Sequence, residues 1–158
     1  MASRKIERGL VVVGVDGSPQ SVAALHWAAR YAAATGAAVR AVCARHHPAA
    51  AGEAPAGAAP EPARHQTEDP GRRRLDEAIA QVYPSGARGE VEAQIADGHP
   101  AQVLIDMSKE ADLLVVGGSG HGGFTGTLVG SVSIHCVTHA CCPVTVVRGT
   151  EADAEASR

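Results

Sequence analysis

Short apolar runs alternate with segments of helical periodicity along most of this chain. The run at 113–116 is continuous and aliphatic, which is typical of a strand buried on both faces of a parallel sheet. Strands are also predicted at 10–15 and 39–44. A further strand is predicted at 91–95, where polar residues alternate outward as at a sheet edge, and a last one at 144–147. The pattern therefore predicts five strands.

Helices are predicted between the strands from their capping signals and from apolar residues at helical spacing. Ser18 and Asp69 are suitable N-cap residues, and each is followed by a proline at the first helical position. The four predicted helices begin at Pro19, Pro70, Pro100 and Ser131 and end before Gly36, before Pro84, at Glu110 and at His139. Strict alternation of strands and helices predicts a parallel α/β sheet with right-handed crossovers.

Length and composition indicate how the chain is divided into a domain, an insertion and a tail. With 158 residues and 45% hydrophobic residues, the chain suits one domain with a single core, expected over 1–150. The segment 46–70 is rich in alanine, proline, glycine and glutamate and has too little apolar surface to offset the cost of ordering, so we interpret it as a mobile insertion. The tail, 151–158, is expected to be disordered.

Charge and hydropathy bear on possible partners. The net charge is −3 and the longest basic run is only three arginines, at 72–74, so no basic stripe indicates nucleic-acid binding. No apolar stretch approaches the roughly twenty residues that span a bilayer, and the N-terminus is polar rather than an apolar signal core. From the sequence we expect a cytoplasmic protein with no membrane and no nucleic-acid partner.

The segment 112–133, DLLVVGGSGHGGFTGTLVGSVS, carries the clearest chemical signal. Seven glycines fall within the fourteen residues 117–130, directly after a buried strand. Such a loop can point several backbone N–H groups at an anion, and Ser131 then opens a helix whose N-terminus favours negative charge. Glycines also mark tight turns and mobile lids, but the arrangement indicates a phosphate cradle.

The spacing G-x2-G-x9-G-S on Gly117, Gly120, Gly130 and Ser131 resembles the ATP-binding signature of the universal stress protein family. The resemblance extends to GLVVVGVDGSPQSVAALHWAARYAAATGAAVRAVCA with Asp16 after the first strand, to DGHPAQVLIDMSKEADLLVVG, and to HACCPVTVVR. It implies a Rossmann-like, open five-stranded sheet of order 3-2-1-4-5 with helices on both faces. It also implies a homodimer paired through the last strand, Val144–Arg148.

In that strand order the first and fourth strands are neighbours at the topological switch, where α/β sheets bind ligands beyond the carboxyl ends of the strands. Asp16 and Gly117 close these two strands and are expected to meet there. The predicted nucleotide-binding residues are Gly14, Val15, Asp16, Ala44, Val116, Gly117, Ser119, Gly120, His121, Gly122, Gly123, Gly130, Ser131, Val132 and Ser133.

Individual roles differ among these residues. Main-chain N–H groups from Ser119 through Gly123 and at Gly130 and Ser131 are expected to hold the phosphates, with hydroxyl groups of Ser131 and Ser133 adding bonds. Asp16 is assigned to the adenosine end, with a turn or helix-cap role as the alternative. For His121, pairing with a phosphate and simple exposure remain equal alternatives. By the resemblance, Gly14, Val15 and Ala44 line the adenine slot and Val132 covers the base or ribose.

Catalytic groups are not evident. The sequence has no G-x4-G-K-[ST] motif and no lysine after Lys109, and nothing indicates a base beside the γ-phosphate. We therefore expect an ATP-binding stress-response regulator, with Mg²⁺ accompanying the ATP, slow hydrolysis at most and no catalytic residue. The alternatives are an interaction module of the same fold that needs no nucleotide, and a weak ATPase.

Four cysteines and a histidine pair complete the candidate chemistry. Cys136, Cys141 and Cys142 cluster in the sequence with His135 and His139, whose spacing of four suits two metal ligands on a helix face. Adjacent cysteines cannot easily turn to one ion, so the favoured interpretation is packing around a helix end, and no metal site is predicted.

Overall fold

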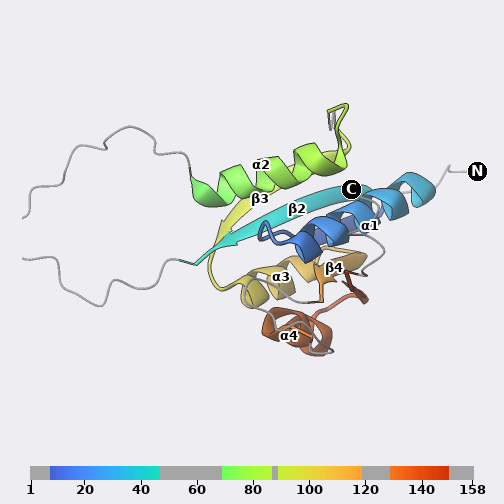
Figure 1. Ribbon diagram of the computed structural model, residues 1–158. Helices are drawn as coiled ribbons and strands as arrows, with labels where there is room; N and C mark the ends of the chain where they lie inside the picture. The colour runs from blue at the N-terminus through green and yellow to red at the C-terminus, as the bar shows by residue number, and fades with distance from the viewer. Residues whose placement is uncertain (1–7, 47–68, 87–88, 119–128, 150–158) are drawn as a thin grey trace, which may run out of the picture.

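The structure, a computed structural model, describes residues 8–46, 69–86, 89–118 and 129–149. Strands and helices alternate strictly through these residues, as predicted (Figure 1). The elements are β1 (Leu10–Gly14), α1 (Pro19–Thr35), β2 (Ala38–Arg45), α2 (Pro70–Val82), β3 (Val91–Asp97), α3 (Pro100–Ser108), β4 (Leu113–Gly117), α4 (Ser131–His139) and β5 (Val144–Val147).

The five strands form one parallel sheet of order β3-β2-β1-β4-β5, which confirms the predicted fold class and topology. The central strand β1 aligns Val11 with Val39 of β2 on one side and with Leu113 of β4 on the other. Strand β5 pairs with β4 and lies at one edge of the sheet, and β3 lies at the other. The switch in strand order therefore falls between β1 and β4.

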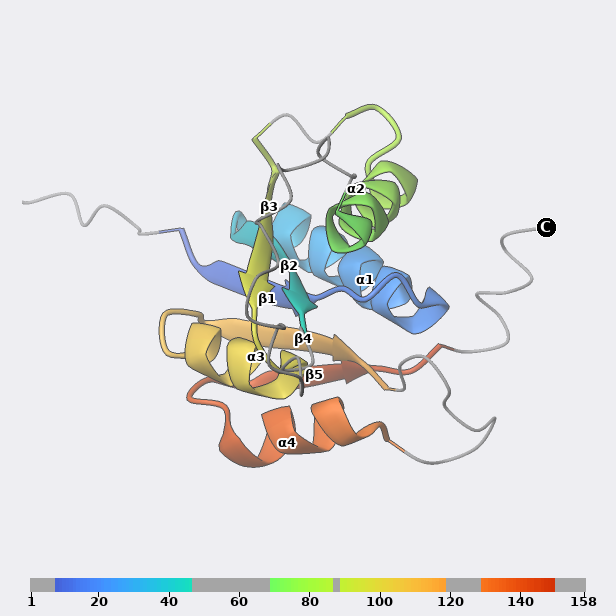
Figure 2. The same cartoon turned by 90° about the vertical axis from the view of Figure 1, so that its left-hand side faces the viewer.

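Helices cover both faces of the sheet, α1 and α2 one face and α3 and α4 the other (Figure 2). The alternating direction of side chains along each strand divides the buried residues into two cores. On the first face, Leu25 and Leu75 are fully buried against the odd-numbered valines of β1. On the second face, Leu104 and Cys136 are buried against Val12.

Three helices begin with a side-chain cap. In α1, Ser18 Oγ accepts a hydrogen bond from the Ser21 amide at 3.2 Å, and in α2, Asp69 Oδ1 accepts one from the Gly71 amide at 3.0 Å. Gly36 ends α1 with φ of 76°, a left-handed conformation that glycine adopts without steric cost. The predicted caps Ser18, Asp69 and Gly36 are thus confirmed.

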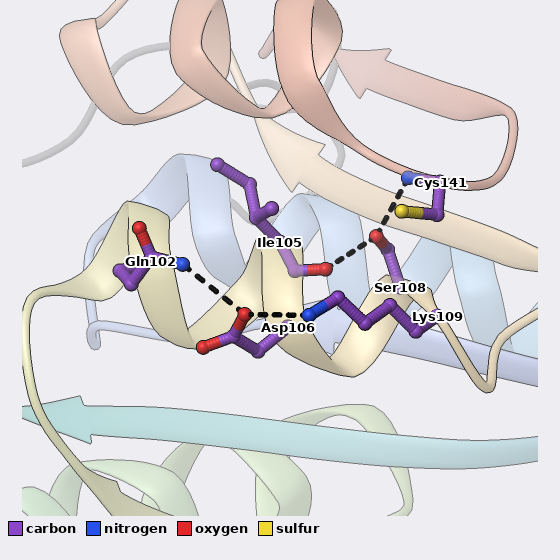
Figure 3. A network of polar contacts seen from close by, with 6 residues as sticks. All are labelled: Gln102, Ile105, Asp106, Ser108, Lys109 and Cys141. Carbon is purple, nitrogen blue, oxygen red and sulfur yellow. Dashed lines mark hydrogen bonds and ion pairs between the residues drawn. The ribbon is translucent and has the colours of Figure 1, made fainter.

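A buried serine ties the end of α3 to the segment before β5 (Figure 3). Ser108 Oγ donates to the Ile105 carbonyl at 2.6 Å and accepts from the Cys141 amide at 2.9 Å. Ser108 is only 1% exposed, so both bonds lie away from water, where an unpaired hydroxyl or amide is costly. This contact attaches the segment between α4 and β5 to the end of α3.

Most of the predicted insertion and the predicted tail lie outside the described residues. Residues at the ends of the insertion are described, and they are held together: Arg45 at the end of β2 pairs with Asp69, the cap of α2, at 2.6 Å. Among the residues that the structure describes, no helix is long and apolar enough to cross a membrane.

Candidate functional site

The turn after β1 is organised by Asp16. Its Oδ1 accepts a hydrogen bond from the Ser18 amide at 2.8 Å, and its own amide donates to Ser21 Oγ at 3.3 Å. Gly17 between them has φ of 85°. The alternative role proposed for Asp16, a turn residue at the start of α1, is therefore present in the structure. It places the carboxylate at the carboxyl end of the central strand.

The other predicted residues of β1 and β2 lie at the carboxyl ends of these two strands, like Asp16. Val15 is 3% exposed, and its amide donates to the Val42 carbonyl at 2.8 Å. Gly14 packs against Leu104 of α3, where an added Cβ would approach Leu104 Cδ1 to 2.7 Å. Ala44 is half-buried near the end of β2. The sheet therefore brings Gly14, Val15, Asp16 and Ala44 together, although they come from two strands.

Gly117 at the end of β4 has a packing role that the sequence did not reveal. A Cβ on this residue would lie 2.9 Å from the backbone carbon and oxygen of Gln20 in the first turn of α1. Real Cβ atoms essentially never come this close to a backbone, so β4 can approach α1 only with glycine here. The next residue, Gly118, donates its amide to the Val147 carbonyl at 2.8 Å.

The two ends of the glycine-rich loop meet. The Gly130 amide donates to the Gly118 carbonyl at 2.6 Å, so the chain leaves β4 and returns to α4 at nearly the same point. Five predicted phosphate-binding residues lie between these ends and outside the described residues. They are Ser119, Gly120, His121, Gly122 and Gly123.

The N-terminus of α4 begins directly at this point. Its cap residue, Gly130, forms no side-chain hydrogen bond, unlike the caps of the other three helices described. Ser131 is exposed and Val132 packs against the core of the α3 and α4 face. Ser133 is 3% exposed, and its hydroxyl donates to the Gly117 carbonyl at 2.5 Å, which ties α4 to the end of β4.

Arg74 also reaches this edge of the molecule, and the sequence analysis did not single it out. Its neighbours Arg72 and Arg73 form ion pairs four residues along α2, whereas the residue four after Arg74 is an alanine. The stem of Arg74 instead packs over Gly17, 3.2 Å from where a Cβ would lie, and lines a small groove between α1 and α2. The sequence could have indicated this, because Arg74 is the arginine of the three that has no acidic residue four positions later.

A buried cysteine lies beside the site. Cys43 in β2 is 4% exposed, and burial raises the pKa of its thiol, with Arg74 acting in the opposite direction and Asp16 and Asp69 adding to the rise. A buried thiol held neutral is a packing residue rather than a nucleophile.

His99 is a further residue that sequence reasoning missed. It caps α3, with Nδ1 accepting a hydrogen bond from the Ala101 amide at 3.3 Å, and its ring meets that of His46 edge to face at 5.9 Å. The signal was the proline after it, which marks the first position of a helix.

The histidine and cysteine cluster is divided by α4. Cys136 faces the core and is fully buried, which raises the pKa of its thiol to about 11. His135 and His139 lie on the exposed side of the same helix. Among the described residues, no group of three or more His, Cys, Asp or Glu side chains is placed to hold a metal ion.

These features define an open parallel α/β domain with a candidate ligand site at its topological switch. On one side of the switch are Asp16 and the end of β1, and on the other are Gly117, Gly118 and the start of α4. Domains of this class bind ligands in the crevice beyond the carboxyl ends of such strands.

The chain belongs to the universal stress protein family, whose sequence model matches residues 8–148. It is 36% identical over 140 residues to the universal stress protein Rv2623 of Mycobacterium tuberculosis, covering 87% of this chain and 46% of that protein. It is 33% identical over 147 residues to Rv2005c of the same organism, covering 90% and 48%. The chain thus spans about half the length of the curated relatives it matches.

Solved structures agree with this assignment. A universal stress protein in complex with cAMP is 30% identical, with a TM-score of 0.63, and the match covers 88% of this chain and 95% of that one. UspA from Lactobacillus plantarum is 25% identical, with a TM-score of 0.64, covering 89% and 97%.

Proposed function

We propose that this chain binds an adenine nucleotide, ATP together with Mg²⁺, in the crevice between the ends of β1 and β4. Two findings support this: the chain belongs to the universal stress protein family, and a structure 30% identical to it was solved with cAMP. Both ligands contain adenine, ribose and phosphate, so one crevice can recognise their shared parts.

The observation that carries the proposal is the start of α4. This helix begins with Gly130, whose amide closes the loop onto Gly118, and it has no side-chain cap on its first amides. The N–H groups of a first helical turn and the positive end of the helix dipole both favour a phosphate at this point. The proposed contacts are the main-chain N–H groups of Gly130 and Ser131 and of the glycine-rich loop.

We assign the remaining parts of the nucleotide to residues at the carboxyl ends of the same strands. Asp16, held at the end of β1, is assigned to the ribose hydroxyls, because a carboxylate accepts from hydroxyl donors. Gly14, Val15 and Ala44 lie toward β2 and are assigned to the adenine slot. Val116 and Val132 supply apolar surface on the β4 and α4 side.

For the activity, we propose a regulator that responds to nucleotide occupancy and hydrolyses ATP slowly at most. The sequence contains no lysine after Lys109 and so has no Walker-type lysine near the proposed phosphate site. Binding would stabilise the folded arrangement by mass action, since a ligand that binds only the native state raises its stability.

We also propose a homodimer through the edge strand β5. This strand is hydrogen-bonded to β4 on one side and forms an edge of the sheet, and an exposed edge invites pairing with another chain. A two-fold pairing of Val144–Arg148 with its own copy would cover that edge.

Calorimetric titration of the purified protein with ATP and Mg²⁺, AMP, cAMP and GTP tests the nucleotide proposal. Asp16→Asn is the informative variant, because an amide oxygen still accepts from the Ser18 amide and keeps the turn, while the negative charge is lost. It should weaken ATP binding about tenfold, the loss of one charged hydrogen bond. Asp112→Asn is the matched control. Asp112 accepts a hydrogen bond from the Leu10 amide at the start of β1, at the opposite end of the strands from the proposed site.

Absence of any heat and of any thermal shift with all four nucleotides would contradict the proposal. Phosphate release at many turnovers per minute would contradict the regulator and favour the enzyme. Equal affinities of the Asp16→Asn and Asp112→Asn variants would remove Asp16 from the site.

A further inference from the structure

Two histidines lie side by side on the outer face of α4. His135 and His139 are four residues apart and exposed, and their rings stack with centroids 5.8 Å apart at an interplanar angle of 22°. Residues at this spacing share one face of a helix. Neither ring is part of the two cores formed by the described residues, and neither is among the proposed nucleotide contacts.

Hydrogen bonds fix the tautomer of both rings. His135 Nδ1 lies 3.1 Å from the Ser131 carbonyl oxygen, and His139 Nδ1 lies 3.2 Å from the His135 carbonyl oxygen. A carbonyl oxygen can only accept, so in each ring Nδ1 carries the proton and donates it. In the neutral ring the lone pair is then on Nε2, the nitrogen further from the backbone.

The second histidine pair of the described residues provides a contrast. His46 and His99 lie at almost the same separation, 5.9 Å, but with an interplanar angle of 75°. His99 Nδ1 accepts from the Ala101 amide, so its lone pair is in use and its proton is on Nε2. Of these two described pairs, the pair on α4 therefore has both Nε2 lone pairs available, whereas His99 uses its Nδ1 lone pair for the cap of α3.

We propose that His135 and His139 bind a divalent transition metal ion through their Nε2 atoms. Two histidines at i and i+4 on one helix face are a recurrent metal-binding arrangement, and ligating histidines characteristically donate their other N–H to a carbonyl or carboxylate. Both conditions are met here before any metal arrives. Imidazole suits Cu²⁺, Ni²⁺ and Zn²⁺ rather than Mg²⁺, so this site is chemically separate from the Mg²⁺ that accompanies ATP.

The site supplies two protein ligands, and water completes the coordination. Metal to nitrogen bonds of about 2.0–2.1 Å place neighbouring ligand nitrogens about 3 Å apart, so the rings tilt toward each other on binding. Both side chains are exposed, which leaves that rotation unhindered by the core. With two ligands the affinity is modest, and binding braces the last two turns of α4.

The test uses protein without a histidine tag and Ni²⁺ as the probe, because Ni²⁺ does not oxidise the exposed thiol of Cys141. Calorimetric titration of the wild type should show one Ni²⁺ per chain. His135→Ala and His139→Ala should each weaken that binding about tenfold or more, since each removes one of two ligands. Circular dichroism before titration verifies that each variant is folded.

Two exposed histidines serve as matched controls. His26 lies on α1, and His46 belongs to the other histidine pair. His26→Ala and His46→Ala should retain the wild-type affinity within about twofold. The proposal is overturned if either α4 variant binds Ni²⁺ as the wild type does, or if His46→Ala weakens it as strongly as they do. Since no nucleotide is present in the titration, its result is independent of the proposed function.

Discussion

The helices α1 and α4 start on opposite sides of the topological switch, and their first turns differ. At the start of α1, protein side chains accept hydrogen bonds from the backbone amides: Ser18 Oγ accepts from the Ser21 amide, and the Asp16 carboxylate accepts from the Ser18 amide. The start of α4 has a glycine cap and no side-chain bond to its first amides. The two helices thus begin differently, because the cap residue of α1 supplies a side-chain acceptor and the cap residue of α4 does not.

Under the proposed function, this difference lets the carboxyl ends of the strands both hold the fold together and receive a phosphate. The α1 turn is a structural joint, in which the polar groups of Asp16, Ser18 and Ser21 bond to one another. The α4 turn is anchored to the end of β4 and the residue after it, by the Ser133 hydroxyl to the Gly117 carbonyl and by the Gly130 amide to the Gly118 carbonyl. Changes at the two cap residues, Ser18 and Gly130, should therefore separate stability from phosphate binding.

The largest effect is expected where β4 meets α1. Gly117→Ala places a Cβ 2.9 Å from the Gln20 backbone and should lower the free energy of unfolding by about 1–3 kcal/mol, because the strand and the helix must move apart. Denaturant unfolding followed by circular dichroism measures this loss. Reduced ATP affinity in this variant would reflect lost structure as well as lost phosphate contacts.

Gly118→Ala is the matched control for that change. Its Cβ would meet the Val147 carbonyl at 3.5 Å, an ordinary contact, so the free energy of unfolding should stay within about 0.5 kcal/mol of the wild type. Equal destabilisation by the two substitutions would show that the approach of β4 to α1 is not what requires Gly117.

The next effect concerns the uncapped turn. Gly130 has φ of −62° and ψ of 157°, a conformation open to any residue and typical of a serine cap. Gly130→Ser should change stability by only a few tenths of a kcal/mol. It should weaken ATP binding about tenfold, because the new hydroxyl takes the amides assigned to phosphate. Titration calorimetry together with thermal unfolding separates the two quantities, and unchanged ATP affinity would contradict the assignment.

The opposite substitution removes the cap of α1. Ser18→Ala should cost about 1 kcal/mol of stability, since the Ser21 amide loses its partner and the site is 3% exposed. The ATP affinity of the folded protein should stay close to that of the wild type. A variant that keeps its stability and loses ATP binding would reverse the roles of the two helix starts.

The last effect appears only at alkaline pH and concerns the inner face of α4. Burial raises the pKa of the Cys136 thiol from 9.0 to about 11, so the unfolded chain releases this proton more readily than the folded one. Stability should therefore fall as pH rises from about 9 to about 11, and Cys136→Ala should flatten that part of the curve. An identical slope in both proteins would show that Cys136 is not buried as described.

The sequence predicted α4 and β5 to the residue, because a glycine before Ser131 and a proline before Val144 mark their starts. It predicted β3 two residues too short. Ala96 and Asp97 join that strand by pairing with Ala44 and Arg45 of β2, a long-range contact that local pattern does not contain.

In the candidate site, too, some features were predicted from the sequence and others depend on long-range contacts. The positions of Asp16 and Gly117 at neighbouring strand ends followed from topology and were confirmed. The packing of Gly117 on Gln20, the path of Arg74 over Gly17 and the cap from His99 depend on contacts between elements far apart in sequence, and they were not predicted. Nucleotide contacts of the predicted residues stay predictions.

The most direct measurement is a comparison of backbone amide NMR shifts on adding adenosine and on adding ATP with Mg²⁺. Adenosine should shift the amides of Val15 and Asp16, and ATP should in addition shift those of Gly130, Ser131 and Val132, while the capped amide of Ser21 in α1 changes little. If ATP instead shifts the start of α1 and leaves the start of α4 unchanged, the phosphate site is not where this account places it.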